Sequence, residues 1–457
     1  MTTDNSLMFP TFARIKMKNI TLIGGGLSGS LMAIFLAKRG YHVDVYERRP
    51  DPRNSNLYAG KSINLALSNR GIAALEKVGL DQAVLQTAIP MSGRMIHSKT
   101  GELSYQPYGK AGQAINSVSR GGLNIRLLEL ADEHENISLH FEHRCINLDN
   151  DCNTAVFEDA SGNTREVSSD VFIGSDGAFA ATRLHLQITR RFDYEQDFEN
   201  YGYKELHIPP AAEGSFALEK NSLHIWPRGN FMMIALPNID GSFTCTLFFP
   251  YEGETSFATI NNEEKARAFF QEYFPDVINI MPDYLNNYLN NPIGNLVTIK
   301  CFPWVFKDKL ALIGDAAHAI VPFYGQGMNC SFEDCVVLDE CIEKHGDNWN
   351  KIFEEYQALR KPNADAIAHL AQQNFIEMRD KVGDAAFLHR KHIEHDLVEH
   401  YGAHFKSQYE LVTFSTRPYT YALEQGKIND QILDALIDRN IQITPGNPEV
   451  MEVLKQF

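Results

Sequence analysis

A glycine-rich segment near the start of the chain has the residue types and the spacing of a nucleotide-binding loop. It reads Gly24-Gly25-Gly26-Leu27-Ser28-Gly29, and such glycines allow a tight turn, close approach of the backbone to a pyrophosphate, and close packing of a helix on a strand. Glu47 follows at the spacing of roughly 20 residues at which an acid binds ribose hydroxyls, which favours a plain 2′-hydroxyl over a 2′-phosphate. We therefore predict that this region binds a dinucleotide through Gly24, Gly26, Leu27, Ser28, Gly29, Glu47 and Arg48.

Two later segments favour FAD over NAD, a choice that the glycine loop alone leaves open. Phe172-Ile173-Gly174-Ser175-Asp176-Gly177 and Leu312-Ile313-Gly314-Asp315-Ala316-Ala317-His318 each run from a strand into a turn. Asp315 can accept a hydrogen bond from a ribityl hydroxyl, and backbone N–H groups after Gly325 can face the electron-rich edge of a flavin ring. The predicted cofactor contacts of these segments are Asp176, Asp315, Gly325, Gly327, Met328 and Asn329.

The hydrophobic pattern indicates the elements that must position these residues. Residues 20–23, 30–39 and 43–46 read as strand, helix and strand, a βαβ unit with the glycine loop at its first turn. Between residues 194 and 300, strand-like stretches separated by turn residues indicate an antiparallel sheet, interrupted by a helix over 263–273. From residue 332 onward the pattern is mainly helical.

This order of elements predicts an α/β fold, α+β overall, with a Rossmann-like FAD-binding domain, an inserted antiparallel-sheet substrate domain and a C-terminal helical region. We expect the FAD-binding domain to be discontinuous, over 14–187 and 299–372. The substrate domain then covers 188–298 and the helical region 373–457. The length of 457 residues agrees with two or three structural units, because one compact core rarely holds so many residues.

The composition argues against several classes of function. The net charge of −16, from 58 acidic and 42 basic residues, disfavours binding to nucleic acids or anionic membranes. The sequence has no apolar run of membrane-spanning length and no signal peptide at its start, so we expect a cytoplasmic protein without a membrane anchor. Seven scattered cysteines without a CxxC pair, and a histidine-rich run over 392–400 with the wrong spacing for a metal site, predict no metal.

The segments GGGLSG, GSDG and GDAAH, with PFYGQG after the last, resemble in order and spacing the single-component FAD aromatic hydroxylases of the para-hydroxybenzoate hydroxylase type. Within that family the chain is most similar to the kynurenine 3-monooxygenases, and the resemblance extends over residues 17–414. The fingerprints of that branch occur here at residues 61–71, 93–97, 106–109, 202–206, 224–227, 235–238 and 322–329. One departure is Ala319, where many relatives have proline.

The resemblance implies an enzyme that consumes NADPH and O₂ and hydroxylates L-kynurenine to 3-hydroxykynurenine through a C4a-hydroperoxide of its bound FAD. Such an enzyme needs no side-chain nucleophile and no metal, because the cofactor carries out the difficult step. The protein must hold the substrate ring in place and exclude water. Its partner is then a small amino-acid substrate, and the protein is expected to be a monomer or a homodimer.

The resemblance also implies a substrate site. At the carboxylate end it places Arg94, Tyr108, Asn374 and Tyr409. Arginine suits this role because its planar fork pairs with a carboxylate through two hydrogen bonds. At the aromatic end it places Ile234, Leu236, Phe248, Phe323 and Tyr324, of which the first two would share one strand face. Arg120 matches the family arginine that reaches the FAD.

Two other functions fit parts of this pattern. A related flavin hydroxylase could act on another anthranilate-like or phenolic acid, and a flavin-binding protein without turnover could keep the same glycine segments. The second alternative does not account for Arg94 and Tyr108, because a protein without a substrate needs no carboxylate clamp.

Overall fold

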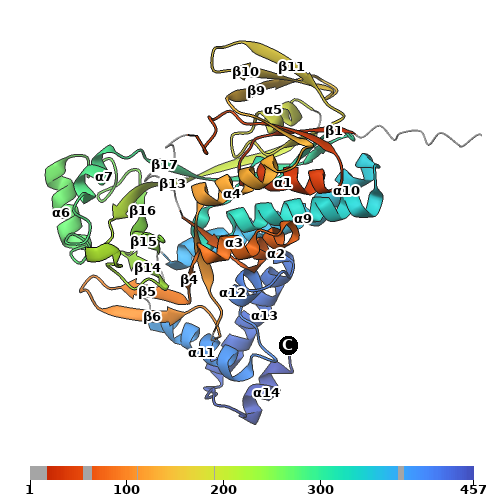
Figure 1. Ribbon diagram of the computed structural model, residues 1–457. Helices are drawn as coiled ribbons and strands as arrows, with labels where there is room; N and C mark the ends of the chain where they lie inside the picture. The colour runs from red at the N-terminus through yellow and green to blue at the C-terminus, as the bar shows by residue number, and fades with distance from the viewer. Residues whose placement is uncertain (1–17, 55–63, 111, 190, 379–384) are drawn as a thin grey trace, which may run out of the picture.

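The computed structural model describes residues 18–54, 64–110, 112–189, 191–378 and 385–457. Figure 1 shows a mainly parallel sheet covered by helices, a mainly antiparallel sheet beside it, and the C-terminal helices below. This mixed α/β architecture confirms the predicted fold class. Among the described residues, no helix is both long enough and apolar enough to cross a membrane.

The glycine loop belongs to a six-stranded sheet in the order β18-β19-β12-β1-β2-β8. β1 (Asn19–Ile23) pairs in parallel with β2 (His42–Tyr46) and β12 (Val171–Gly174). The helix between β1 and β2, α1 (Leu27–Lys38), confirms the predicted βαβ unit, although it begins directly after Gly26 and so earlier than predicted. The sheet is completed by β8 (Ile137–His140), β19 (Leu310–Leu312) and β18 (Val305–Phe306).

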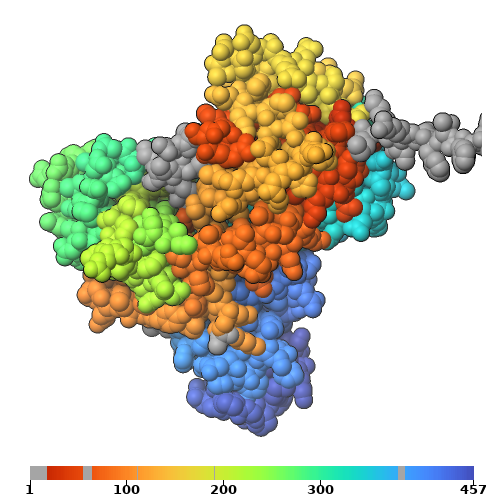
Figure 2. Space-filling view, in the orientation of Figure 1, coloured from red at the N-terminus to blue at the C-terminus, as the bar shows by residue number. Residues whose placement is uncertain are grey.

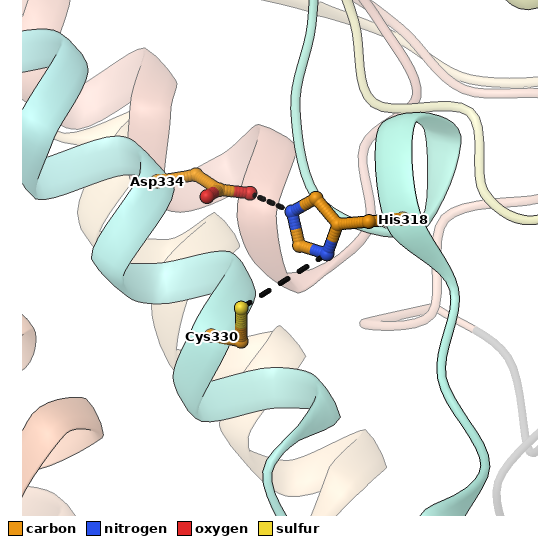
Figure 3. A group of neighbouring side chains, drawn as sticks. All are labelled: His318, Cys330 and Asp334. Atoms are coloured by element: carbon orange, nitrogen blue, oxygen red, sulfur yellow. Dashed lines mark hydrogen bonds and ion pairs between the residues drawn. The ribbon is translucent and has the colours of Figure 1, made fainter. Parts of the chain in front are cut away.

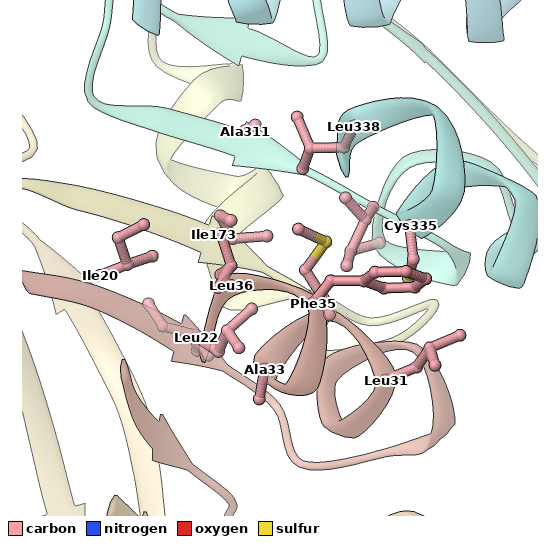
Figure 4. Packing of buried hydrophobic residues seen from close by; sticks show 14 of the residues in the cluster. Ile20, Leu22, Leu31, Ala33, Phe35, Leu36, Ile173, Ala311, Cys335 and Leu338 are labelled. Carbon is pink, nitrogen blue, oxygen red and sulfur yellow. The ribbon is translucent and has the colours of Figure 1, made fainter. Parts of the chain in front are cut away.

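The core behind this sheet holds the glycine loop on a rigid support. α1 is buried on nearly all sides because α4 (Arg120–Asp132) and α9 (Gly327–His345) pack on it. Figure 4 shows the nearly fully buried side chains that meet there from β1, β12, α1 and α9: Ile20, Leu22, Ile173, Leu31, Phe35, Cys335 and Leu338. Close packing of this kind leaves little freedom for the turn that follows β1.

The second large sheet has seven strands in the order β17-β13-β16-β15-β14-β5-β6. Its strands are β17 (Gly294–Phe302), β13 (Asp193–Ile208), β16 (Phe243–Pro250), β15 (Met232–Pro237), β14 (Ser222–Pro227), β5 (Gly93–His97) and β6 (Leu103–Pro107). The pairs within 193–302 are antiparallel, as predicted, and α6 (Glu263–Tyr273) has the predicted bounds. α7 (Tyr284–Asn290) packs with α6.

Two strands of this sheet come from the range predicted to belong wholly to the FAD-binding domain. β5 pairs in parallel with β14, which lies more than a hundred residues later, and β6 forms the edge. A parallel pairing between distant segments leaves no local sequence pattern, since periodicity shows only which residues form a strand. The boundaries at residues 188, 299 and 373 stay a prediction.

Two small sheets and several short helices connect these parts. One sheet consists of β3 (Asn64–Leu67), β7 (Ile115–Ser119) and β4 (Ile89–Met91), and the other of β9 (His143–Leu148), β10 (Thr154–Asp159) and β11 (Thr164–Ser168). The short helices are α2 (Asn69–Val78), α3 (Asp81–Gln86), α5 (Ala181–Gln187) and α8 (Asp315–His318), with the 3-10 turns η2 (Ala212–Gly214) and η3 (Pro322–Tyr324).

The C-terminal part is helical, which confirms the prediction for the chain after residue 332. It contains α10 (Trp349–Ile376), α11 (Ala385–Tyr401), α12 (Gln408–Thr413), α13 (Tyr419–Asp438) and α14 (Pro448–Leu454). In Figure 2 the blue helices form the lower part of the molecule and lie against the orange segment that includes α2 and β5. Segments far apart in the sequence therefore meet where the substrate residues were predicted.

Candidate active site

The glycine loop combines two tightly packed glycines with one open glycine. A Cβ on Gly29 would overlap the carbonyl oxygen of Gly24 and lie 2.6 Å from the hydroxyl of Ser175. Gly24 has φ +110, and a Cβ there would lie 2.9 Å from the Cα of Asp176. A Cβ on Gly26 would meet nothing within 4 Å, so the backbone at Gly26 is open to a ligand. This is the arrangement that a pyrophosphate requires: packed glycines behind the turn and an accessible N–H at the helix start.

Glu47 lies at the end of β2, beside this loop. Its carboxylate accepts hydrogen bonds from the N–H of Gly25 at 2.8 Å and from the backbone N–H and the Nε of Arg49 at 2.9 and 2.8 Å. Burial opposes ionisation of Glu47, but the hydrogen bonds and charge of Arg49 outweigh it and lower the pKa of the carboxyl group. Glu47 therefore stays ionised and can accept hydrogen bonds from ribose hydroxyls.

A pocket of about 200 Å³ opens next to Glu47, lined by Gly25, Glu47, Arg49, Pro50, Pro52, Asn124 and Phe141. The Oδ1 of Asn124 is buried and, within the described part of the chain, has no hydrogen-bond partner. A buried acceptor without a partner is costly unless a ligand donates to it. Glu47, Asn124 and the open Gly26 thus fit the adenosine and pyrophosphate half of FAD. Leu27 and Ser28 start α1 at the open turn.

The sequence analysis predicted neither Asn124 nor Arg49 as a cofactor residue, and it named Arg48 in place of Arg49. Arg48 is exposed and does not line the pocket, so its cofactor contact stays a prediction. Arg120, the first residue of α4, is exposed. Burial raises the pKa of Tyr203, and the positive charge of Arg120 partly offsets this rise. The contact of Arg120 with FAD stays a prediction. A signal for Asn124 was available, since it lies one helical turn after Arg120.

The flavin segment that follows β19 forms a sharp turn held from behind by a buried acid. The N–H of Gly314, at φ +60, donates to Asp334 at 2.9 Å, and Asp315 then starts α8 with an exposed side chain. Gly325, at φ +65, ends η3, and a Cβ there would lie 2.9 Å from the Cβ of Ala66. Gly327 and Met328 start α9 directly afterwards. An exposed carboxylate and an open helix start suit a ribityl chain and a flavin ring, and the cofactor contacts of Asp315, Gly325, Gly327 and Met328 stay a prediction.

Two of the predicted cofactor residues use their side chains within the protein. Asn329 accepts from the N–H of Ser68 at 3.0 Å and donates to the carbonyl oxygens of Ala66 and Gly325, both at 2.8 Å. Asp176 accepts from the N–H and the hydroxyl of Thr182 at 3.1 and 2.5 Å, and so holds the start of α5. Both side chains therefore shape the turns, and a contact of either residue with a cofactor stays a prediction.

His318, Cys330 and Asp334 lie close together, as Figure 3 shows. His318 Nε2 lies 2.5 Å from Asp334, and His318 Nδ1 lies 3.9 Å from the Cys330 sulfur. These residue types bind metals, but Arg360 donates to Asp334 at 2.7 Å and lies 3.3 Å from the same sulfur. The guanidinium group already supplies the positive charge there, so we interpret the group as a structural ion network.

The predicted residues of the carboxylate end come together from distant parts of the chain. Arg94 on β5 lies under the rings of Tyr108 and Tyr409, at 5.4 and 5.2 Å from their centroids. Tyr409 on α12 stacks on Tyr108 at 5.2 Å and on Tyr324 of η3 at 5.6 Å. The Nε of Arg94 is buried without a hydrogen-bond partner, and among the described residues no carboxylate forms an ion pair with Arg94. Arg94 is thus a buried cation whose described partners are tyrosine side chains.

Asn374 lies at this end, but it mainly supports the turn. Its amide nitrogen donates to the carbonyl oxygen of Phe323 at 2.6 Å and contacts the sulfur of Met378 at 3.4 Å. Only the side-chain oxygen of Asn374 remains for a ligand. The ring of Phe323 in turn stacks on Phe375 at 4.0 Å and is tilted against Phe248 at 4.8 Å.

Ile234 connects the polar end of the site to the aromatic end. Ile234 and Leu236 alternate on β15, and Leu236 packs with Tyr108. Ile234 packs both against that group and against the cluster that contains Phe248, Phe323 and Tyr324. The predicted polar and apolar residues therefore belong to two clusters that Ile234 joins.

Two acidic residues near the carboxylate end were not predicted. Burial raises the pKa of Tyr324, and the negative charge of Glu377 raises it further, with a smaller effect from Glu394. Lys391 on α11 lies 3.0 Å from Glu394 and 3.9 Å from Glu377. The polar end thus holds a buried cation and nearby anions. No local sequence signal marks these acids, because they reach the site only through the packing of α10 and α11.

Comparison with known proteins gives the same family from several directions. A family model described as an FAD binding domain matches residues 17–269 and 300–371. A kynurenine 3-monooxygenase of Flavobacterium johnsoniae is 48% identical over 433 residues, which cover 94% of this chain and 96% of that protein. A kynurenine 3-monooxygenase of Dictyostelium discoideum is 46% identical over 436 residues, or 93% of this chain and 94% of that protein.

Solved structures show the same fold at low sequence identity. The tetrameric form of 2-methyl-3-hydroxypyridine-5-carboxylic acid oxygenase has a TM-score of 0.66 at 19% identity, covering 82% of this chain and 95% of that chain. P. aeruginosa PqsL in complex with 2-aminobenzoylacetate has a TM-score of 0.66 at 19% identity, covering 82% of this chain and all of that chain. These similarities concern the fold alone.

Proposed function

The chain belongs to the kynurenine 3-monooxygenase family of FAD-dependent monooxygenases, and from this premise we propose that it hydroxylates L-kynurenine to 3-hydroxykynurenine with NADPH and O₂. One observation carries the proposal for the substrate. Arg94 is a cation with a buried, unpartnered Nε, surrounded by tyrosine rings and without a carboxylate partner among the described residues. A buried charge of this kind needs a counter-ion, and the carboxylate of an amino acid supplies one.

The charges at the polar end match a zwitterion. Arg94, with the hydroxyl groups of Tyr108 and Tyr409, would hold the carboxylate, because guanidinium and phenol groups both donate hydrogen bonds. The acidic side chains of Glu377 and Glu394 act electrostatically on Tyr324 at the same end. Lys391 offsets one of their two charges, and the negative charge that remains would favour the α-ammonium group. A substrate with both charges is thus preferred over a simple aromatic acid.

The apolar residues at the other end would orient the aromatic ring and exclude water. Ile234 and Phe248 face the turn that carries Phe323 and Tyr324, and aromatic contacts of 4.8 Å and 4.0 Å hold that turn in place. The flavin, when bound, supplies the electron transfer and the activation of O₂. The side chains of this chain then contribute orientation and the exclusion of water, which protect the reaction from side products.

The proposal is tested with purified protein loaded with FAD. L-Kynurenine should stimulate NADPH oxidation, and 3-hydroxykynurenine should form in an amount close to the NADPH consumed. The decarboxylated analogue of kynurenine is the matched control, since it keeps the ring and lacks the group that Arg94 would bind. NADPH oxidation that yields only H₂O₂ with kynurenine would contradict the proposal and favour a different aromatic substrate.

We further propose that the protein acts in the cytoplasm as a monomer or a homodimer. All seven cysteines are free and buried, which suits a reducing compartment. Light scattering after size-exclusion chromatography distinguishes the two assemblies, and a larger mass would contradict both.

A further inference from the structure

The segment 68–71 belongs to a fingerprint that the proposed site does not use directly. Of that fingerprint, residues 61–63 lie outside the described residues. Arg70, in the first turn of α2, is 2% exposed, although it carries a charge and lies outside the substrate cluster. Charged side chains are buried to this degree only when their partners are fixed. The partners of Arg70 show what it holds.

Arg70 binds the C-terminal end of α12. Its Nε donates to the carbonyl oxygen of Val412 at 3.2 Å, and its Nη2 donates to the carbonyl oxygen of Arg417. The neighbouring Asn69 donates to the carbonyl oxygen of Phe414 at 3.0 Å. The last carbonyl groups of a helix have no partner within the helix and must be satisfied from outside. The start of α2 therefore supplies the donors that the end of α12 needs.

The same guanidinium group has two further contacts. Its Nη1 pairs with Glu333 of α9 at 2.6 Å, and the ring of Tyr419 lies 3.8 Å from its central carbon. The hydroxyl of Tyr419 in turn donates to Gln326 at 3.0 Å, within the turn between η3 and α9. Arg70 thus joins the helices of the flavin side to the chain segment between α12 and α13.

α12 is the helix that carries Tyr409, and it has only six residues. A helix of this length is not stable by itself, so its position depends on its contacts. Its N-terminal end is held by a capping box between Ser407 and Glu410. Its C-terminal end is held by Asn69 and Arg70. Loosening either end would shift the tyrosine that covers Arg94.

We propose that Arg70 is a positioning residue for substrate binding, which holds the end of α12 so that Tyr409 stays against Arg94. The inference rests on the proposed function for the identity of the substrate. It predicts that Arg70 acts on the Michaelis constant for kynurenine and on the coupling of NADPH oxidation to product. FAD binding should depend on it much less, because Glu333 also pairs with Arg360 at 2.5 Å, a contact that does not involve Arg70.

The test compares Arg70→Met, which keeps the length of the side chain, with Arg267→Met on the surface of α6. Arg267 forms an exposed ion pair with Glu263 at 2.7 Å and controls for the loss of one charge. We expect Arg70→Met to raise the Michaelis constant about 10-fold or more, since buried hydrogen bonds to a charged group are lost. The share of NADPH diverted to H₂O₂ should rise, while the FAD content stays unchanged. Arg70→Lys should recover part of the loss, because it keeps the pair with Glu333 but not the two carbonyl contacts.

Hydrogen exchange of residues 408–417 gives a readout that does not depend on the substrate. In Arg70→Met these amides should exchange faster than in the wild type, whereas those of α1 should not. An unchanged Michaelis constant with unchanged exchange would overturn the inference, and so would a loss of FAD in step with the loss of activity. If the wild type itself fails to hydroxylate kynurenine, the proposed function fails, but the exchange experiment still decides whether Arg70 holds α12.

Discussion

Replacing Arg94 by methionine is the most direct test of the substrate site. Among the described residues, Arg94 has no carboxylate partner, so a bound substrate would supply its only full counter-charge there. Truncating one partner of a buried charge pair costs about 2–5 kcal/mol. Tyr108 and Tyr409 would remain to donate hydrogen bonds to the substrate carboxylate, so we place the loss near 3 kcal/mol, or about 150-fold in affinity.

The assay is a thermodynamic cycle that uses two ligands and three proteins. Dissociation constants for L-kynurenine and its decarboxylated analogue are measured with wild type, Arg94→Met and Arg94→Lys, each loaded with FAD. Arg94→Met should weaken the binding of kynurenine about 150-fold and that of the analogue only slightly, because the analogue lacks the carboxylate with which Arg94 would interact. Arg94→Lys should lose roughly 10-fold, since it keeps the charge but not the planar fork.

The same measurements can refute the role of Arg94 in binding the carboxylate. If Arg94→Met weakens both ligands by the same factor, Arg94 supports the shape of the site and does not bind the carboxylate. If neither ligand is weakened, Arg94 has no part in substrate binding.

Three further predictions concern the cofactor side. Gly29→Ala should destabilise the protein by about 3 kcal/mol or more, because the added Cβ overlaps the packed turn. Gly26→Ala should fold normally and lose affinity for FAD. Equal melting temperatures of the two variants would contradict this prediction. Glu47→Ala should weaken the binding of FAD about 10- to 100-fold in a fluorescence titration, because hydrogen bonds to charged groups contribute about 1.5–3 kcal/mol. Unchanged affinity would show that Glu47 stabilises the glycine loop and does not bind FAD. Burial alone would lower the pKa of His318, but Asp334 raises it well above 6.5, so its stabilising effect is complete below pH 6.5 and is lost as the pH rises through the folded pKa. The wild-type melting temperature should therefore fall above pH 6.5 more steeply than that of His318→Asn, and parallel curves would exclude this role.

Local sequence patterns predicted the elements that are formed by residues close together in the sequence. β1, α1 and β2, the glycine loop and the bounds of α6 follow from periodicity and turn residues within short windows. The predicted partners of the substrate site also meet, because the family resemblance carried information on distant contacts that periodicity lacks. What local patterns could not provide is the pairing of β5 with β14, which joins Arg94 to the sheet of the aromatic end.

The roles of polar residues were harder to predict than their positions. Asn329, Asp176 and Asn374 were all predicted to contact a ligand, yet each uses side-chain hydrogen bonds within the protein. Conversely, Asn124 was not predicted, and its buried acceptor has no partner among the described residues. Whether an amide binds a ligand or a turn depends on which donors and acceptors the folded chain leaves unsatisfied, and this is a property of tertiary structure.

The stability of the ligand-free protein separates a binding role of Arg94 from a structural one. The pKa of Arg94 is raised by Tyr409 and Tyr108 against the opposing effect of burial, but at neutral pH phenol groups are uncharged and supply only dipoles. A buried cation with such partners is costly, and replacing it by an apolar side chain of similar size is often neutral or stabilising. We therefore expect Arg94→Met to melt at the same temperature as the wild type or higher, while it loses kynurenine. A structural arginine would give the opposite result, because its removal would lower the melting temperature. If Arg94→Met is clearly less stable than the wild type without ligand, Arg94 has a structural role, and its unpaired charge no longer supports an amino-acid substrate.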